Sequence, residues 1–206
     1  MNVILDYDSG NLDSVFRAFN DAGIKTIISK DEKTIENATS LVLPGVGAFK
    51  DAMDALKKSG LIPLIKRHVE KGKYLFGICL GMQLLYEFGY EYGRYEGLGL
   101  LKGDVKYLDI KLKVPHMGWN NLYFKKDDPI IKYVSEGSYV YFVHSYYVDS
   151  KGDELISYTN YEVLVPAIIR KNNIYATQFH PEKSGSVGAS ILKAYKEILD
   201  DYTSSN

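Results

Sequence analysis

The stretch Tyr74-Leu75-Phe76-Gly77-Ile78-Cys79-Leu80-Gly81-Met82-Gln83 decides the fold, because an apolar strand ends in it and a helix begins. A glycine stands two residues before Cys79 and another stands two residues after it. Glycines here permit a sharp turn in which strand and helix pack so closely that a Cβ atom would clash. A turn of this kind is a nucleophile elbow, which lifts the side chain at its apex above the sheet. A cysteine that only fills a core does not need both glycines, so the stretch predicts Cys79 as a nucleophile.

The segments around this stretch alternate between short apolar strands and amphipathic helices. Strands are predicted over residues 3–7, 24–29, 41–43 and 74–78, and helices over 11–22 and from 187 onward until the chain frays at Thr203. This βαβ order predicts an α/β fold with a mostly parallel central sheet and helices on both faces. Between residues 105 and 170 the pattern changes to alternating strands separated by turn residues, which predicts an antiparallel extension. We expect residues 1–206 to form a single domain.

A thiol nucleophile needs a base, and His180 is the best candidate among the four histidines. It follows an alternating apolar strand, as Cys79 does, and Pro181 ends that strand. Glu182 stands two residues beyond His180, a spacing that suits a carboxylate bound to the far imidazole nitrogen. The sequence therefore predicts Cys79 as nucleophile, His180 as general base and then general acid, and Glu182 as the group that orients the imidazole.

The other three histidines have different surroundings. His68 falls in a helical pattern with apolar residues on one side, which predicts a solvated position for it. His116 and His144 stand in stretches rich in tryptophan, tyrosine and asparagine, a composition more typical of recognition loops than of packing.

Acyl transfer also needs donors for the developing oxyanion. The segment Pro44-Gly45-Val46-Gly47 follows a short buried strand, and its glycines let backbone amides turn toward the nucleophile. The predicted donors are the amides of Val46 or Gly47 and of Leu80. A glycine-rich turn after a strand can also hold phosphate, but neither the Gly-x-Gly-x-x-Gly nor the Walker pattern is present at this turn.

In order and spacing, three motifs resemble those of the class I, or triad, glutamine amidotransferases. They are Pro44-Gly45-Val46-Gly47, the segment 77–83 around Cys79, and Gln178-Phe179-His180-Pro181-Glu182. Within that class the chain more closely resembles the glutaminase subunits of imidazole glycerol phosphate synthase. This closer resemblance depends on Asp6-Tyr7 with Gly10-Asn11-Leu12 and Ser14-Val15, on Pro115-His116-Met117-Gly118-Trp119-Asn120 and on Phe142-Val143-His144-Ser145-Tyr146-Tyr147. It covers essentially the whole chain and implies the flavodoxin-like fold of the class.

The resemblance implies an activity and a set of roles. Cys79 would attack the side-chain amide of L-glutamine, release ammonia and form a glutamyl thioester, which water and His180 would resolve to glutamate. In the family the segment 44–47 reorients before the oxyanion hole of Val46, Gly47 and Leu80 is complete. The implied glutamine-binding residues are Gln83, Glu91, Ser145 and Tyr146. The implied partner-interface residues are Asn11, Trp119 and Lys183.

The implied partner is a (βα)8-barrel synthase subunit in a heterodimer. In that family the ammonia passes to the barrel, and the products are imidazole glycerol phosphate and aminoimidazole carboxamide ribotide of histidine biosynthesis. Two stretches depart from the family pattern. Asp8-Ser9-Gly10-Asn11 stands where Gly-Met-Gly-Asn is usual, a change that affects the contacts expected with the partner subunit. Gly89-Tyr90-Glu91-Tyr92-Gly93 stands where an acidic Ser-Glu-Glu-Gly stretch is usual, which concerns glutamine contacts.

Three alternatives stay open at this level. The chain could supply ammonia for the amidation of surface sugars, act as a free-standing cysteine amidase, or be a non-catalytic subunit that kept the fold. Dependence of the activity on a second protein separates the first two, and the intact Cys79, His180 and Glu182 argue against the third.

Composition narrows the class of protein further. The formal net charge is −1 and no basic stripe is present, which argues against nucleic acid as a main partner. One cysteine excludes an intrachain disulfide and leaves no cysteine cluster for zinc. The first residues, Met1-Asn2-Val3-Ile4-Leu5-Asp6, lack a basic leader, and no stretch approaches the length of an apolar membrane span. We therefore expect a cytoplasmic, metal-free protein without a cofactor.

Overall fold

The structure is a computed structural model that describes residues 1–8, 11–150 and 152–204. Its centre is an eight-stranded sheet with the strand order β2-β1-β3-β4-β14-β13-β12-β9. The strands β2, β1, β3, β4 and β14 are parallel, and β13, β12 and β9 continue the sheet in antiparallel pairing. The strands of this sheet are β1 (Asn2–Leu5), β2 (Thr26–Ser29), β3 (Ser40–Leu43), β4 (Tyr74–Ile78), β9 (Tyr123–Phe124), β12 (Leu155–Tyr161), β13 (Val163–Lys171) and β14 (Ile174–Thr177).

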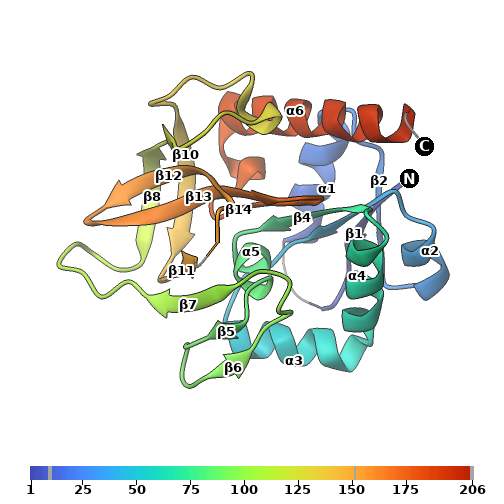
Figure 1. The fold of residues 1–206 in the computed structure, drawn as a ribbon, viewed down its shortest axis with the longest axis horizontal. Coiled ribbons are helices and arrows are strands. Elements are labelled where there is room, and N and C mark those ends of the chain that lie inside the picture. Colours follow the sequence, from blue (N-terminus) through green and yellow to red (C-terminus); the bar gives the residue numbers. More distant parts are fainter. Residues whose placement is uncertain (9–10, 151, 205–206) are drawn as a thin grey trace.

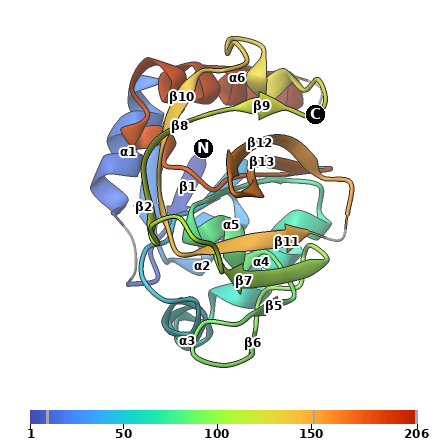
Figure 2. The same cartoon turned by 90° about the vertical axis from the view of Figure 1, so that its left-hand side faces the viewer.

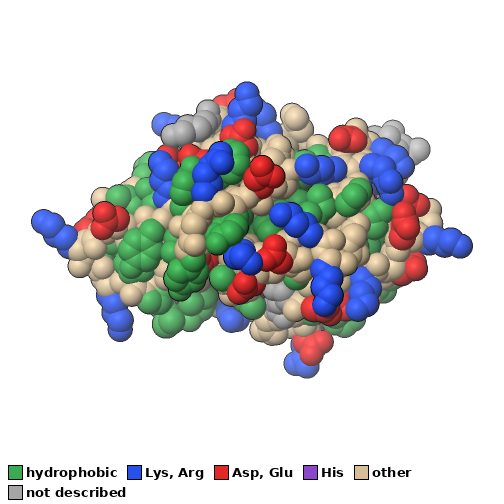
Figure 3. Space-filling model, turned by 90° about the horizontal axis from the view of Figure 1, so that it is seen from below, with side chains coloured by type: hydrophobic (Ala, Val, Ile, Leu, Met, Phe, Trp, Pro, Cys, Tyr) green, Lys and Arg blue, Asp and Glu red, His purple; other side chains and the backbone are tan. Residues whose placement is uncertain are grey.

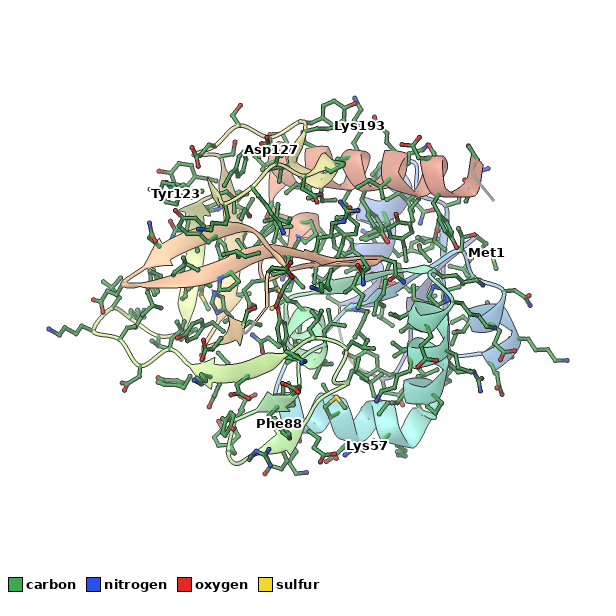
Figure 4. The ribbon with its side chains drawn as sticks, in the orientation of Figure 1. Met1, Lys57, Phe88, Tyr123, Asp127 and Lys193 are labelled. Atoms are coloured by element: carbon green, nitrogen blue, oxygen red, sulfur yellow. The ribbon has the colours of Figure 1, made fainter. Side chains whose placement is uncertain are left out.

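Helices cover both faces of the parallel part (Figures 1 and 2). The helices α1 and α6 lie on one face, and α3 and α4 lie on the other (Figure 1). The helical elements are α1 (Leu12–Asp21), α2 (Glu32–Glu36), α3 (Phe49–Ser59), α4 (Leu61–Glu70), α5 (Leu80–Leu84), η1 (Pro129–Ile131), η2 (Pro181–Lys183) and α6 (Gly185–Ser204). The element η1 packs on α6, and Figure 4 shows Lys193 of α6 at the same edge of the molecule as Asp127, which precedes η1.

Alternation along the parallel strands explains the two layers. Val3 and Leu5 face the core shared with α3 and α4, whereas Ile4 faces the core shared with α1 and α6. In the same way Leu75 faces the first core and Phe76 the second. Successive side chains of a strand point to opposite faces of a sheet, so strands that are apolar throughout must be covered on both sides.

Two smaller sheets stand at the carboxyl end of the parallel strands. One has the order β11-β7-β5-β6 and the other pairs β10 with β8. Their strands are β5 (Phe88–Gly89), β6 (Tyr95–Glu96), β7 (Gly103–Tyr107), β8 (His116–Asn121), β10 (Tyr139–His144) and β11 (Tyr146–Ser150). In Figure 3, hydrophobic side chains gather toward the end where Figure 1 places β7 and β8, while charges of both signs cover the rest of that face.

The fold class predicted from the sequence is confirmed. The order β2-β1-β3-β4-β14 is the flavodoxin-like order, and the antiparallel extension falls in the region where the sequence changes to alternating strands.

Three local expectations were wrong. The segment 116–121 is a strand and not a loop, and α6 continues through Thr203 to Ser204. His68 is buried and lies 3.1 Å, through Nε2, from the carbonyl oxygen of Tyr74, because α4 turns this side chain toward the beginning of β4. Ser9 and Gly10 of the opening stretch lie outside the described residues.

Candidate active site

Cys79 stands at a strained turn between β4 and α5. Its backbone angles are φ 53° and ψ −109°, a conformation that non-glycine residues seldom adopt. A Cβ atom at Gly81 would lie 1.9 Å from the carbonyl oxygen of Leu43, and one at Gly77 would lie 3.0 Å from the carbonyl oxygen of Gly81. Gly77 is therefore required by the close approach of β4 and α5, as the sequence predicted. Gly81 is required by the close approach of α5 to Leu43 of β3.

The register of the parallel strands brings three chain segments together at the carboxyl edge of the sheet. Gly77 of β4 is paired with Leu43 of β3, and Ile78 is paired with Thr177 of β14. The residues that follow these pairs are therefore neighbours, and the amide of Cys79 donates to the carbonyl of Thr177 at 2.7 Å. Ligand sites in open α/β sheets form at this edge.

Two polar groups besides His180 lie next to the sulfur of Cys79. The side-chain amide of Gln178 donates to it at 3.7 Å, and the thiol lies 3.8 Å from the carbonyl oxygen of Val143. The motif that contains Gln178 was recognised in the sequence, but the contact of its side chain with Cys79 was not predicted. Gln178 follows Thr177, just as Cys79 follows Ile78, the residue paired with Thr177. The position of Gln178 directly after a strand was therefore the sequence feature that could have indicated this contact.

His180 and Glu182 form a buried pair next to Cys79. The Nδ1 atom of His180 lies 2.7 Å from Oε1 of Glu182. The backbone of His180 is held by the carbonyl of Tyr141 at 3.1 Å and the hydroxyl of Ser184 at 2.6 Å. Its Nε2 atom is buried and makes no hydrogen bond to a nitrogen or oxygen atom of the described residues.

The electrostatics of this pair favour a charged imidazole. Burial works against the charge, but the interactions of His180 with Cys79 and Glu182 outweigh it and raise the pKa of His180 to about 10. One imidazole nitrogen is thus committed to Glu182, and the other is available for proton transfer at the sulfur.

A pocket of about 300 Å³ opens beside the sulfur, a volume suited to a small molecule. It contains every predicted catalytic, oxyanion-hole and glutamine-binding residue except Glu182, which lies behind His180. The lining residues are Val46, Gly47, Cys79, Leu80, Gln83, Glu91, Pro115, Val143, His144, Ser145, Tyr146 and His180.

The predicted oxyanion segment lies along one wall of this pocket. The hydroxyl of Tyr7 donates to the carbonyl of Pro44 at 2.5 Å and so fixes the beginning of the segment. A Cβ atom at Gly45 would lie 2.9 Å from the amide nitrogen of Gly81, so the segment also packs against the elbow. Gly47 has φ +92°, which favours glycine, although a Cβ atom there would meet nothing within 4 Å.

Glu91 and Gln83 form other parts of the pocket wall. The Oε2 atom of Glu91 accepts a hydrogen bond at 2.7 Å from the backbone amide of Phe49, the first residue of α3. The side-chain nitrogen of Gln83 donates to the carbonyl of Tyr146 at 2.8 Å and to Oε1 of Gln178 at 3.0 Å. Since both N–H groups of Gln83 are engaged, a ligand would meet its carbonyl oxygen.

His116 and His144 pair across β8 and β10, with His144 in the wall of the pocket and His116 behind it. Their Nδ1 and Nε2 atoms, respectively, are 3.0 Å apart, and Nδ1 of His144 lies 2.9 Å from the carbonyl oxygen of Tyr146. Burial lowers the pKa of His116 to about 4, and burial together with His116 lowers that of His144 to about 3. These two histidines are therefore buried and neutral. The sequence had instead indicated recognition loops at both positions.

The three residues predicted at a partner interface lie outside the pocket. Asn11, Trp119 and Lys183 are all exposed, and Trp119 has 56% of its surface accessible. Asn11 directly precedes α1, which contacts η2, the element that ends with Lys183. The indole of Trp119 packs edge-on against Tyr141 of β10 at a ring distance of 6.1 Å.

No group of three or more His, Cys, Asp or Glu side chains in residues 1–8, 11–150 and 152–204 is arranged to hold a metal ion. No helix within these ranges is long and apolar enough to cross a membrane.

Comparisons with known proteins agree with this geometry. The family model "Glutamine amidotransferase class-I" matches residues 3–195. The chain is 53% identical over 198 residues to imidazole glycerol phosphate synthase subunit HisH of Lactococcus lactis subsp. lactis, covering 96% of this chain and 98% of the relative. It is 50% identical over 197 residues to the subunit of the same name from Caldanaerobacter subterraneus subsp. tengcongensis, covering 95% and 97%. A crystal structure titled as a glutamine amidotransferase has a TM-score of 0.75 at 20% identity, covering 96% of this chain and 97% of its own, which shows the same fold.

Proposed function

The chain belongs to the class-I glutamine amidotransferase family, as a HisH-type glutaminase subunit of imidazole glycerol phosphate synthase, and from this premise we propose how its residues carry out the reaction. The proposed reaction is hydrolysis of L-glutamine to glutamate and ammonia through a thioester on Cys79. The observation that carries it is the convergence of Cys79, His180 and a substrate-sized pocket at the carboxyl edge of the sheet.

The first half of the reaction forms the thioester. The sulfur of Cys79, as thiolate, attacks the carboxamide carbon of glutamine, and the charge that develops on oxygen is stabilised by backbone amides of the segment 46–47 and of Leu80. The imidazolium of His180 then gives its Nε2 proton to the leaving nitrogen. The carbon–nitrogen bond breaks, ammonia departs, and a γ-glutamyl thioester remains.

The second half restores the enzyme. The now neutral His180 takes a proton from a water molecule, whose oxygen attacks the thioester carbon. The carbon–sulfur bond breaks, the sulfur of Cys79 departs as a thiolate, His180 keeps the proton that it took from water, and glutamate leaves. The 2.7 Å contact with Glu182 keeps Nδ1 of His180 protonated in both halves, so that Nε2 faces the reacting atoms.

Glutamine itself would be held by Gln83, Glu91, Ser145 and Tyr146, all of which line the pocket. The carboxylate of Glu91, which would bind glutamine, also accepts the hydrogen bond from the amide of Phe49, two residues after Gly47. This contact supports a coupling between glutamine binding and the oxyanion segment. Binding of the substrate would thereby affect the position of the oxyanion segment.

The proposal includes a partner, since the relatives are named as subunits of a synthase. We assign a (βα)8-barrel synthase subunit to the exposed surface of Asn11, Trp119 and Lys183, in a heterodimer that delivers ammonia for the synthesis of imidazole glycerol phosphate and aminoimidazole carboxamide ribotide. On the strength of the family alone, the proposal also includes one domain over residues 1–206 and a cytoplasmic location.

The test measures glutamate release by the chain alone and with the barrel subunit and its ribonucleotide ligand. We expect strong stimulation by the pair. Cys79→Ala should abolish glutamine hydrolysis and leave the use of external ammonium by the complex intact. High activity of the chain alone would favour a free-standing amidase, and loss of both activities in Cys79→Ala would contradict a catalytic role for the cysteine.

A further inference from the structure

A run of hydrogen bonds begins on β8 and ends on the pocket wall. The side-chain nitrogen of Asn120 lies 3.3 Å from Nε2 of His116, whose Nδ1 lies 3.0 Å from Nε2 of His144. The Nδ1 atom of His144 then lies 2.9 Å from the carbonyl oxygen of Tyr146. Asn120 is the neighbour of the exposed Trp119, so the run joins the surface of β8 to the pocket.

The run continues from the pocket wall to the sulfur. The carbonyl of Tyr146 also accepts the bond from Gln83 at 2.8 Å, and the same nitrogen of Gln83 contacts Gln178 at 3.0 Å. The nitrogen of Gln178 donates to Cys79 at 3.7 Å. The carbonyl of Tyr146 is therefore the point at which the histidine pair and the groups around the thiol meet.

The chemistry of the partners determines where each proton lies. A carbonyl oxygen only accepts, so Nδ1 of His144 carries a proton, and Nε2 of the neutral ring accepts from Nδ1 of His116. His116, also neutral, then accepts at Nε2 from Asn120. The backbone amide of Asn121 donates to Oδ1 of Asn120 at 2.9 Å, which turns the nitrogen of Asn120 toward His116.

Both rings are held in this state by their surroundings. His116 lies between the rings of Phe142 and Tyr161, at centroid distances of 4.8 and 3.9 Å, and both histidines are buried. Protonation of His144 would place two N–H groups against each other across the 3.0 Å contact. A pair that only filled space would not need this exclusive arrangement of donors and acceptors.

We propose that His116 and His144 are positioning residues for glutamine hydrolysis: as neutral, Nδ1-protonated rings they hold the Tyr146 carbonyl and, through Gln83 and Gln178, the sulfur of Cys79. The expected effect on kcat rests on the proposed function. The expected tautomers of His116 and His144 rest on the hydrogen bonds alone. It adds a role for two residues that contact neither the sulfur nor His180 by a hydrogen bond.

The first experiment reads the tautomers directly. Nitrogen-15 NMR of the ring nitrogens in the full-length protein at pH 7 should show a protonated Nδ1 and an unprotonated Nε2 for both His116 and His144. A protonated Nε2 on either ring would overturn the proposal. This measurement needs no variant and no catalytic activity.

The second experiment separates hydrogen bonding from packing at position 116. His116→Phe keeps a flat ring between Phe142 and Tyr161 and removes the donor, whereas His116→Asn loses the ring and keeps an amide N–H near the place of Nδ1. We expect His116→Phe to lower kcat for glutamine in the complex roughly tenfold, since small misplacements can slow an enzyme by up to about a hundredfold, and His116→Asn to retain more activity. Higher activity in His116→Phe than in His116→Asn would assign the residue to packing and overturn the proposal.

His68→Phe is the matched control, because His68 is also buried and bonded to a backbone carbonyl but lies away from the pocket. Its kcat and KM should equal those of the wild type. Alkylation of Cys79 by iodoacetamide in the isolated chain gives a readout that does not depend on glutamine, since the chain has no other cysteine. We expect alkylation to slow in His116→Phe and not in His68→Phe, and equal rates in all three proteins would overturn the proposal.

These readouts distinguish the two possible failures. If the wild-type complex did not hydrolyse glutamine, the proposed function would fail. The tautomers and the alkylation rates would still test whether His116 and His144 position the groups around Cys79. If Cys79→Ala were inactive and His116→Phe fully active, the proposed function would stand without the positioning role.

Discussion

The Nδ1 atom of His180 lies 2.7 Å from Oε1 of Glu182, and the two side chains expose only 3% and 1% of their surface. A carboxylate so close and so well shielded from water stabilises the imidazolium strongly. The same contact sets the tautomer of His180 and therefore directs Nε2 toward Cys79.

Glu182→Gln tests this pair, because it keeps the shape of the side chain and removes its charge. We expect glutaminase kcat to fall on the order of 10³- to 10⁴-fold, as when the carboxylate of a related triad is lost. The measurement is steady-state glutamate release by the complex. A loss smaller than about tenfold would show that His180 does not depend on Glu182 for its orientation.

The same variant changes how stability depends on pH. The pKa of His180 is raised above its ordinary 6.5 to about 10, so its contribution to stability is complete below pH 6.5 and is lost as pH rises toward 10. Glu182→Gln should lower that pKa. The difference in free energy of unfolding between wild type and variant, measured with urea at several pH values, should therefore be largest near pH 6 and shrink toward pH 10.

Gly81→Ala should disrupt the elbow. The new Cβ atom would lie 1.9 Å from the carbonyl oxygen of Leu43, so α5 and β3 must separate, and we expect a loss of stability above about 3 kcal/mol together with loss of activity. Gly72→Ala is the control, because its φ of +76° strains the backbone but nothing lies within 4 Å. It should cost about 1 kcal/mol and spare activity. Similar urea midpoints for the two variants would contradict the steric explanation.

His68 should contribute to sensitivity to mild acid. Burial lowers its pKa from 6.5 to about 4, so the unfolded chain binds a proton more readily and stability falls as pH drops from 6.5 toward 4. His68→Phe removes this titration, and its free energy of unfolding should change less between pH 7 and pH 5 than that of the wild type. An equal change in both proteins would show that His68 titrates normally in the folded state.

Trp119→Ala tests the proposed partner surface. An aromatic side chain that is 56% exposed on a strand is a typical anchor of an interface, and its removal should weaken binding of the barrel subunit by about 2 kcal/mol or more. Lys183→Ala should weaken binding more at low salt than at high salt. Calorimetric titration measures both, and Tyr133→Ala is a control because this exposed tyrosine lies beside Glu197 of α6. Unchanged affinity in Trp119→Ala would place the interface elsewhere.

Local pattern was sufficient for much of the molecule. The Gly-x-Cys-x-Gly frame alone predicted the elbow, since a Cβ atom has no room beside such a turn, and two apolar faces on the short strands predicted the two helical layers. The pairing of His180 with Glu182 followed from a spacing of two residues around a proline. The pairing of His180 with Glu182 depends on residues close in sequence, whereas the glycine frame and the apolar faces are local patterns whose contacts reach other strands and helices, as Gly81 reaches Leu43 of β3.

Only the tertiary structure decided what lies around these elements. The contact of Gln178 with Cys79 depends on the register between β4 and β14, which lie about a hundred residues apart in the chain. The burial of His68 depends on which side of α4 faces the beginning of β4, and the bond between His116 and His144 depends on the pairing of β8 with β10. Sequence by itself determined the residues that can react and the turn that presents them, because the glycine spacing around Cys79 and the change from strand to helix are visible in the local pattern. The fold determined which distant polar groups surround them, because strand register and helix packing are set by the whole core.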